Sequence, residues 1–273
     1  MRTALSLLVV LACSACQAPG GPDYDKLPAV DVRGSGRYTT VLLKTRPGVR
    51  QAFSLSVPER PAAVVLYFRG ATGIDRGTRW IEDGLQRHDI ATAVIDPPSD
   101  LPQGFAAGER SRANHVTDID AVIRHLHHTL RVPVWLAGIS MGSVSVANVG
   151  VNTSAGVQGV VFLSSITSTR FGRNSYGERL ASSFALGELK VPVLALAHAL
   201  DGCQLTPPSG AAEIVRRAAR SPAREVKVFE GGHQFGRDPC LGSTYHVFSG
   251  IQPQVVDHIA AFIRKHSKLE SGG

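Results

Sequence analysis

One serine in the middle of the chain has the local sequence that a catalytic nucleophile needs. The segment Val132–Asn148 reads V-P-V-W-L-A-G-I-S-M-G-S-V-S-V-A-N, with Ser140 at the centre of a G-x-S-x-G pattern. The pattern alone is common by chance, but the apolar run before it predicts a strand and the small residues after it predict a helix. In that context the serine sits on a strained turn with its hydroxyl exposed, and the glycines avoid collisions with neighbouring backbone. We therefore expect Ser140 to be a nucleophile.

Alternating strands and helices must position this serine. Besides the strand before Ser140, the expected strands are Tyr38–Thr45, Gln51–Val57, Ala62–Phe68, Ile90–Ile95, Gly159–Leu163, Lys190–Ala197 and Glu225–Phe229. Besides the helix after Ser140, the expected helices are Trp80–His88, Arg112–Leu130, Ala211–Ala219 and Pro253–Lys265. The first two strands flank a Pro-Gly turn and predict an antiparallel hairpin. The rest of the alternation predicts an α/β fold with a mostly parallel central sheet and helices on both faces.

Length and charge narrow the functional class. The chain of 273 residues is long enough for one large domain. Its net charge is +7, but the Arg and Lys residues are interleaved with Asp and Glu instead of forming a basic stripe with aromatic residues. We therefore expect no nucleic-acid partner. We also expect a monomeric protein. The segment between Ser165 and Lys190 is too short for a separate lid domain, which predicts an open site.

The N-terminal segment is typical of an exported protein. Arg2 precedes an apolar run, Ala4–Ala12, that is too short to span a bilayer. Cys13 and Cys16 each follow a small residue, as in a bacterial lipobox, so one of them could carry a lipid, or the signal could simply be cleaved. We expect a signal peptide over 1–16, a flexible tether over 17–36, one domain over 37–266 and a disordered tail over 267–273. The protein would be exported, and either periplasmic or a membrane-anchored lipoprotein whose only membrane contact is the lipid.

Export changes the interpretation of the two remaining cysteines. Cys203 and Cys240 would enter an oxidising compartment. There an even pair is more often a disulfide than two free thiols. We expect a Cys203–Cys240 bridge.

The order of these features resembles the α/β-hydrolase superfamily over about 37–266, and within it the small, lid-less, exported serine hydrolases of the dienelactone-hydrolase type. The resemblance implies a Ser–acid–His triad in that chain order. The acid of relatives follows the second strand after the nucleophile, which implies Asp201 in A-H-A-L-D-G-C. The base would be His246. In relatives the final helix begins a short distance after the catalytic histidine and often opens with a proline, and His246 lies at that distance before the proline at position 253. The alternative base is His233, which comes soon after the last strand.

The resemblance also implies an oxyanion hole of two backbone N–H groups. One would come from Met141, directly after the nucleophile, and the other from Ala71, in the turn after the strand that ends at Phe68. Relatives often have His-Gly in this turn, where this chain has Arg69-Gly70. The Arg69 side chain could bind a ligand, but we expect it to form a salt bridge at the rim.

The remaining histidines, glycine patterns and arginines do not indicate a metal or cofactor site. His125, His127 and His128 have no carboxylate or cysteine at metal-ligand spacing, so we expect no metal and assign them to a helix surface. Phosphate-binding and dinucleotide-binding glycine patterns are absent from the sequence, and we expect no cofactor. Arg170 and Arg173 could contact an acidic substrate, although solvated arginines are the default.

The pattern as a whole predicts a serine hydrolase that cleaves a carboxylic ester or a related acyl bond of a small molecule. Two alternatives stay open at this point. The chain could be an envelope lipoprotein that binds a ligand without chemistry, because a fold does not determine function. It could also be an amidase or peptidase on the same fold. The sequence does not identify the substrate.

Overall fold

The computed structural model describes residues 30–33, 38–71, 79–105, 108–171, 174–175 and 180–267. The strands are β1 (Val30–Arg33), β2 (Thr39–Arg46), β3 (Val49–Ser56), β4 (Ala63–Phe68), β5 (Ile90–Ile95), β6 (Val134–Ser140), β7 (Gly159–Ser165), β8 (Arg170–Phe171), β9 (Asn174–Ser175), β10 (Val193–His198) and β11 (Arg224–Phe229). The α-helices are α1 (Trp80–Gln86), α2 (Ala113–Leu130), α3 (Gly142–Asn152), α4 (Ser209–Arg217) and α5 (Gln252–His266). Short 3₁₀ helices are η2 (Glu109–Ser111), η3 (Ala181–Ser183), η4 (Leu186–Glu188) and η5 (Tyr245–Val247).

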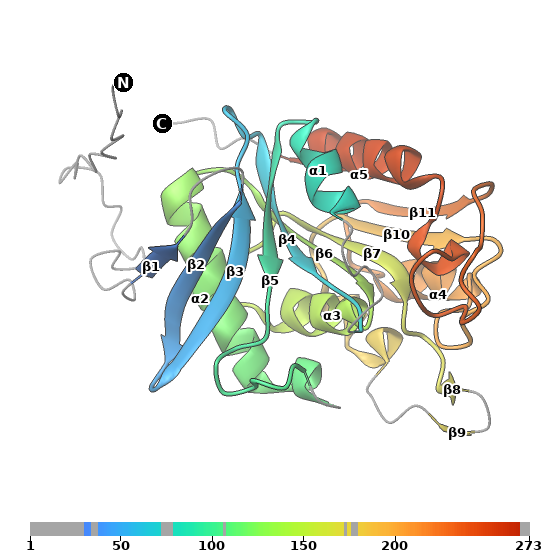
Figure 1. The fold of residues 1–273 in the computed structure, drawn as a ribbon, viewed down its shortest axis with the longest axis horizontal. Coiled ribbons are helices and arrows are strands. Elements are labelled where there is room, and N and C mark those ends of the chain that lie inside the picture. Colours follow the sequence, from blue (N-terminus) through green and yellow to red (C-terminus); the bar gives the residue numbers. More distant parts are fainter. Residues whose placement is uncertain are drawn as a thin grey trace.

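A nine-stranded sheet forms the centre of the molecule, in the order β1-β2-β3-β5-β4-β6-β7-β10-β11 (Figure 1). The strands β5, β4, β6, β7, β10 and β11 run parallel to one another, whereas β2 pairs antiparallel with β1 and with β3, and β3 pairs antiparallel with β5. The sequence predicted this mostly parallel sheet and its N-terminal hairpin, and both are confirmed.

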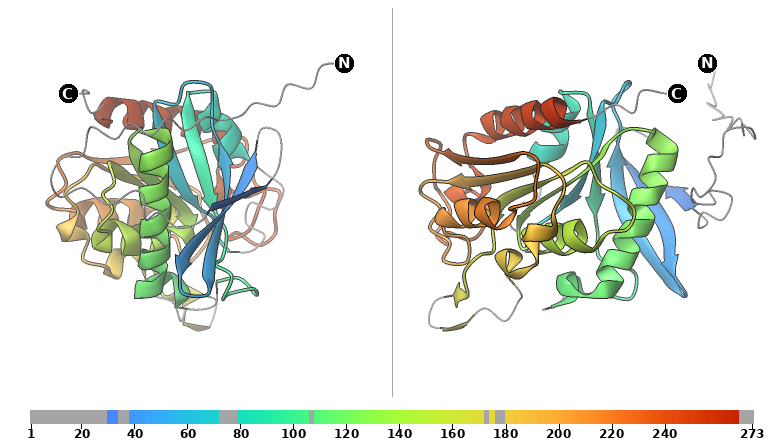
Figure 2. Two further views of the ribbon diagram at one scale, coloured as in Figure 1. Left: turned by 90° about the vertical axis from the view of Figure 1, so that its left-hand side faces the viewer. Right: turned by 180° about the vertical axis from the view of Figure 1, so that it is seen from behind.

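Helices cover both faces of the sheet, as the alternation of elements predicted (Figure 2). Every residue of β4, β5, β6, β7 and β10 is buried, because side chains on both faces meet a helix. One apolar cluster joins the sheet to α2, α3 and α4, and a second joins the opposite face to α1 and α5. Parallel strands with continuous apolar sequences are the usual result of such two-sided burial.

The structure differs from the expected tether at one place. Residues 30–33 fall inside the segment expected to be flexible, yet they form β1 and pair antiparallel with β2, from Val30 opposite Leu43 to Arg33 opposite Thr40. The alternating Val30 and Val32 are a strand pattern too short to stand out beside the Pro- and Gly-rich residues before it. The sheet therefore begins earlier in the chain than predicted.

Several sequence-based expectations concern residues outside those described. They include the signal peptide, Cys13, Cys16, Arg173 and all of the tail after Ser267. Among the described residues, the helices are too short or too polar to cross a bilayer. The segment that links β7 to β10 contains the small β8–β9 sheet and the turns η3 and η4 in its described parts.

Candidate active site

Ser140 lies at the carboxyl end of β6, on the turn that leads into α3. Its φ angle is 53°, in the left-handed region that residues other than glycine seldom adopt. Such strain costs free energy and is concentrated at functional sites in proteins. Ser140 is only 4% exposed, so the residue lies in a closely packed turn.

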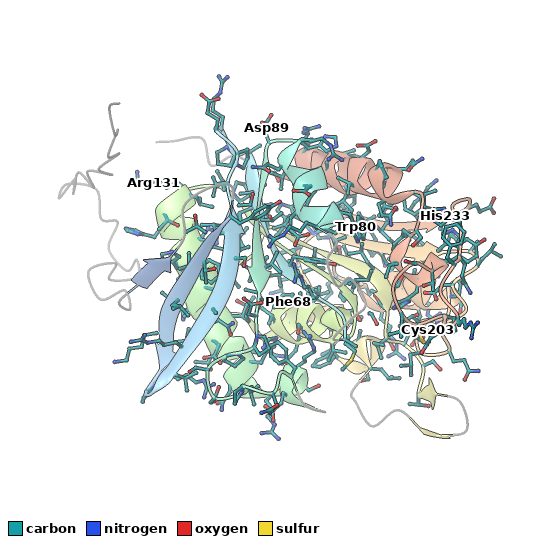
Figure 3. The ribbon with its side chains drawn as sticks, viewed as in Figure 1. Phe68, Trp80, Asp89, Arg131, Cys203 and His233 are labelled. Atoms are coloured by element: carbon teal, nitrogen blue, oxygen red, sulfur yellow. A yellow bond between two sulfur atoms is a disulfide. The ribbon has the colours of Figure 1, made fainter. Side chains whose placement is uncertain are left out.

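The two glycines of the pattern allow this close packing. A Cβ atom on Gly138 would lie 2.4 Å from the carbonyl oxygen of Gly142, and one on Gly142 would lie 2.0 Å from the carbonyl oxygen of Phe68. Either distance is a severe collision, so only glycine fits. The first turn of α3 therefore contacts the end of β4, and the chain that follows Phe68 begins beside the nucleophile turn. In Figure 3, Phe68 lies near the middle of the molecule.

Asp201 and His246 form a buried pair. Asp201 Oδ2 lies 2.9 Å from Nδ1 of His246, and both side chains are completely buried. Asp201 also accepts a hydrogen bond on Oδ1 from the backbone N–H of Cys203 and one on Oδ2 from the hydroxyl of Thr206, each at 2.9 Å. The Thr206 hydroxyl is also 3.1 Å from His246 Nδ1. Several contacts therefore orient the carboxylate and the imidazole.

The other imidazole nitrogen of His246 is available. Nε2 is buried and makes no hydrogen bond within the described part of the chain. A buried polar atom without a hydrogen bond in a native structure calls for an explanation. One explanation is that the atom is free to bind a reaction partner. A base that receives a proton from a serine needs a free acceptor of this kind.

Ser164 connects His246 to the turn that carries Ser140. Its hydroxyl donates a hydrogen bond of 2.8 Å to the carbonyl oxygen of His246. Ser164 lies near the end of β7, and the next residue, Ser165, is the partner of Ser140 in the parallel pairing of β6 with β7. The same strand end thus contacts both the end of β6 and the turn that carries His246.

His233, the alternative base, lies in a different environment. It is exposed, its backbone N–H donates to the carbonyl of Ser249 at 3.0 Å, and its ring contacts the ring of Phe235 at a centroid distance of 4.5 Å. No hydrogen bond between its ring and Asp201 is found among the described residues. Figure 3 shows His233 in the outer loops beside β11.

The expected disulfide is present. Cys203 and Cys240 are bonded, with a Cα–Cα distance of 4.7 Å, and they are 37 positions apart in sequence. The bridge joins the loop that holds Asp201 to the segment that leads to His246. On the same two segments, a Cβ atom on Gly202 would lie 3.2 Å from Pro239.

The turn after β4 carries the other expected donor. Gly70 is buried and Ala71 is partly buried, whereas residues 72–78 lie outside the described ranges. The Arg69 side chain forms a salt bridge of 2.8 Å with the buried Glu82, as expected for this residue. Burial raises the pKa of the nearby Asp96 above its usual value, and the positive charges of Arg69 and Arg79 oppose that shift.

The histidines of α2 correct one expectation. His125 was assigned to the helix surface, but it is 8% exposed and its ring packs edge-on against Phe53 in the core. Burial, followed by the charge of His128, lowers its pKa. Its position on the same side of the helix as Val122 and Leu126 explains the burial. Within the described ranges, no three metal-ligating side chains are grouped.

Three residues beside the site were not singled out from the sequence. They are Thr206, Ser164 and Arg110, of which Arg110 lies in η2 and contacts the turn after β4. Thr206 follows Asp201 closely, and a short polar side chain just after a candidate acid is a usable signal. Ser164 and Arg110 carry no such signal, because their contacts depend on segments far apart in the chain.

Comparisons with known proteins agree with this architecture at the level of the fold. No protein-family model and no curated protein matches the sequence. Among solved structures, an esterase from Pyrococcus furiosus matches with a TM-score of 0.63 and 14% identity, over 88% of this chain and 98% of that one. The esterase domain of a Rhodothermus marinus protein matches with a TM-score of 0.58 and 17% identity, over 85% and 99% of the two chains.

A third similar structure is an α/β serine hydrolase homologue from Coxiella burnetii, with a TM-score of 0.57 and 16% identity over 83% of this chain and 96% of that one. Identities this low establish the fold and not the reaction. The chain therefore has the α/β-hydrolase fold, as the sequence predicted.

Proposed function

We propose that the protein is a serine hydrolase that cleaves a carboxylic ester through an acyl-enzyme on Ser140. His246 is the general base, Asp201 orients it, and the N–H groups of Met141 and Ala71 stabilise the oxyanion. The observation that supports this most strongly is the buried Asp201–His246 hydrogen bond of 2.9 Å, together with the unpartnered Nε2 on the far side of the ring.

The acylation step uses each of these groups once. The Ser140 hydroxyl oxygen attacks the ester carbonyl carbon while His246 Nε2 takes the hydroxyl proton. Asp201 stabilises the imidazolium that forms, because its carboxylate already accepts a hydrogen bond from Nδ1. The carbonyl oxygen becomes an oxyanion, and the two backbone N–H groups donate hydrogen bonds to it. Collapse of the tetrahedral intermediate releases the alcohol, which takes the proton from Nε2.

Deacylation repeats the same chemistry with water. His246 takes a proton from water, and the resulting hydroxide adds to the acyl carbon. When the second tetrahedral intermediate collapses, the carboxylic acid leaves and Ser140 regains its proton from His246. The left-handed φ of Ser140 and the similarity to esterase structures support this assignment of roles. An amide substrate would follow the same steps, and no feature of the site favours it.

Labelling with a fluorophosphonate probe tests the proposal. The probe phosphonylates an activated serine, and mass spectrometry of the digested protein locates the modified residue. We expect the label on Ser140, and we expect p-nitrophenyl acetate hydrolysis to fall by roughly 10⁴-fold in Ser140→Ala. Heat-denatured protein is the control for non-specific labelling. If the native protein takes no label and hydrolyses no ester, the proposal is wrong and a binding role for the fold becomes the better hypothesis.

A further inference from the structure

A buried arginine lies between the two segments that supply the proposed oxyanion donors. Arg110 belongs to η2 and is only 6% exposed. Burying a guanidinium away from water is costly unless its N–H groups are hydrogen-bonded. The partners of Arg110 are therefore informative about why it is there.

The guanidinium joins α3 to the turn after β4. Nη1 donates a hydrogen bond of 2.9 Å to the hydroxyl of Ser145, which lies on α3 five positions after Ser140. Nη2 donates to the carbonyl oxygen of Arg69 at 3.1 Å and is 3.5 Å from that of Gly70. The planar fork of an arginine can hold two such segments at a fixed spacing, which a lysine ammonium cannot do.

Arg110 is itself held in place. Its guanidinium lies over the ring of Phe105, with Cζ 4.3 Å from the ring centroid. Its backbone carbonyl accepts a hydrogen bond of 3.0 Å from Nδ2 of Asn148, and the same nitrogen donates to the carbonyl of Arg112 at 3.1 Å. Asn148 is also on α3 and is buried. Both the side chain and the backbone of Arg110 are therefore tied to the helix that begins at the nucleophile turn.

Together with peptide geometry, these contacts fix the direction in which the N–H groups of the turn point. In a trans peptide the C=O and the N–H point in opposite directions, and no cis peptide is found in the described part of the chain. The carbonyls of Arg69 and Gly70 share their peptide units with the N–H groups of Gly70 and Ala71. When Arg110 attracts these two carbonyls, both N–H groups point away from it.

We infer that Arg110 is a positioning residue for the oxyanion hole: it holds the turn after Phe68 so that the Ala71 N–H faces the substrate oxygen at Ser140. The inference rests on the proposed function. Arg110 contacts no reacting atom and acts through the backbone of the turn. The close approach of Gly142 to the carbonyl of Phe68 holds the start of the same turn against α3.

Two substitutions of Arg110 test the inference. Arg110→Met keeps most of the volume and removes the fork, and Arg110→Lys keeps the charge but can reach only one carbonyl well. For Arg110→Met we expect kcat for p-nitrophenyl acetate to fall about 100-fold with KM changed less than threefold, because one oxyanion donor is worth 10²–10³-fold in kcat. Arg110→Lys should recover part of the loss.

Binding of a trifluoromethyl ketone separates positioning from general damage. Such a ketone forms a tetrahedral adduct on an active serine and places a negative oxygen in the oxyanion hole. We expect its affinity for Arg110→Met to fall by the same factor as kcat. The matched control is Arg46→Met, since Arg46 is also an enclosed guanidinium, hydrogen-bonded to Asp118 at 2.8 Å and to Asp100 at 2.9 Å on another part of the fold. It should lower Tm and leave both kcat and ketone affinity near the wild-type values.

Each outcome decides something different. If Arg110→Met keeps kcat and ketone affinity within threefold of a wild-type enzyme that depends on Ser140, the inference about Arg110 is wrong and the proposed function stands. If the wild-type protein shows no Ser140-dependent hydrolysis, both are wrong. If Arg110→Met does not fold, Ser145→Ala decides instead: it removes the Nη1 acceptor, and we expect a roughly tenfold loss in kcat with KM unchanged. An unchanged kcat in Ser145→Ala and Arg110→Lys would overturn the inference.

Discussion

Asp201 Oδ2 lies 2.9 Å from His246 Nδ1, and the two side chains are shielded completely from solvent. The pair spans the loop after β10 and the turn η5, which are 45 positions apart in sequence. A carboxylate on Nδ1 holds the neutral imidazole in the tautomer whose Nε2 carries a lone pair. That is the form in which a histidine can take a proton from a serine.

The first prediction concerns which histidine is the base. His246→Ala should lower kcat/KM for p-nitrophenyl acetate by at least roughly 10³-fold, because Ser140 would lose its proton acceptor. His233→Ala should change it less than threefold, since His233 is exposed and lies outside the Asp201 contacts. Steady-state kinetics of the two variants, with circular dichroism to verify folding, give the comparison. A large loss in His233→Ala with a mild one in His246→Ala would reverse the assignment.

The second prediction concerns the Thr206 hydroxyl. It donates a hydrogen bond of 2.9 Å to the same carboxylate oxygen that faces His246. Thr206→Val keeps the shape and removes this bond, so we expect kcat to fall about tenfold, as the loss of one hydrogen bond to a charged group implies. KM should stay unchanged because Thr206 does not touch the substrate in the proposed mechanism. Thr206→Ser retains a hydroxyl and should keep most of kcat; equal losses in both variants would argue against the hydrogen bond as the cause.

The regular elements were predictable because their patterns are local. A few neighbouring residues are enough to predict each of these elements. The examples are the apolar run of β6, the glycines around Ser140 and the amphipathic pattern of α2. The strand boundaries agree with the structure to within a few positions. One exception, β1, is four residues long and gains its stability from pairing with β2, which a local pattern does not reveal.

The candidate site was only partly predictable from the sequence, because some of its contacts are local in the chain and others join distant segments. Ser140 could be found because a strained turn needs glycines at fixed spacing. Spacing to the final helix favoured His246 over His233, but it could not show which of the two loops meets Asp201 in space. The contacts of Ser164 and Arg110 depend on strand register and on the packing of η2 against α3, so no single segment encodes them.

The third prediction concerns the disulfide. Cross-linking Cys203 to Cys240 closes a loop of 37 positions, and restricting the unfolded chain in this way is worth about 3–4 kcal/mol. We expect Cys240→Ser to lower the free energy of unfolding by about that amount in a urea titration. Activity should fall as well under conditions where the variant is still folded, because the bridge holds the Asp201 loop against the segment before His246. Wild-type turnover in a Cys203→Ser, Cys240→Ser double variant would show that the bridge has no positioning role.

The last prediction is a pH dependence of stability that comes from His115. The ring is 4% exposed and packs edge-on between Phe68 and Phe105. Burial, assisted by the charge of Arg110, lowers its pKa from 6.5 to about 3. Between these two pH values the unfolded chain binds a proton that the folded chain does not accept, so the free energy of unfolding falls as the pH falls.

The size of this effect follows from the pKa difference. One proton changes the free energy of unfolding by about 1.4 kcal/mol per pH unit, so moving from neutral pH to pH 5 should cost about 2 kcal/mol through His115 alone. Urea titrations of the wild type and of His115→Leu at both pH values measure it. The variant should lose less stability on acidification, by about that amount, and retain the acid sensitivity that the lowered pKa of His125 contributes. His233→Gln, which changes an exposed imidazole, should behave like the wild type; an identical acid response in His115→Leu and the wild type would mean that His115 is protonated in the folded protein.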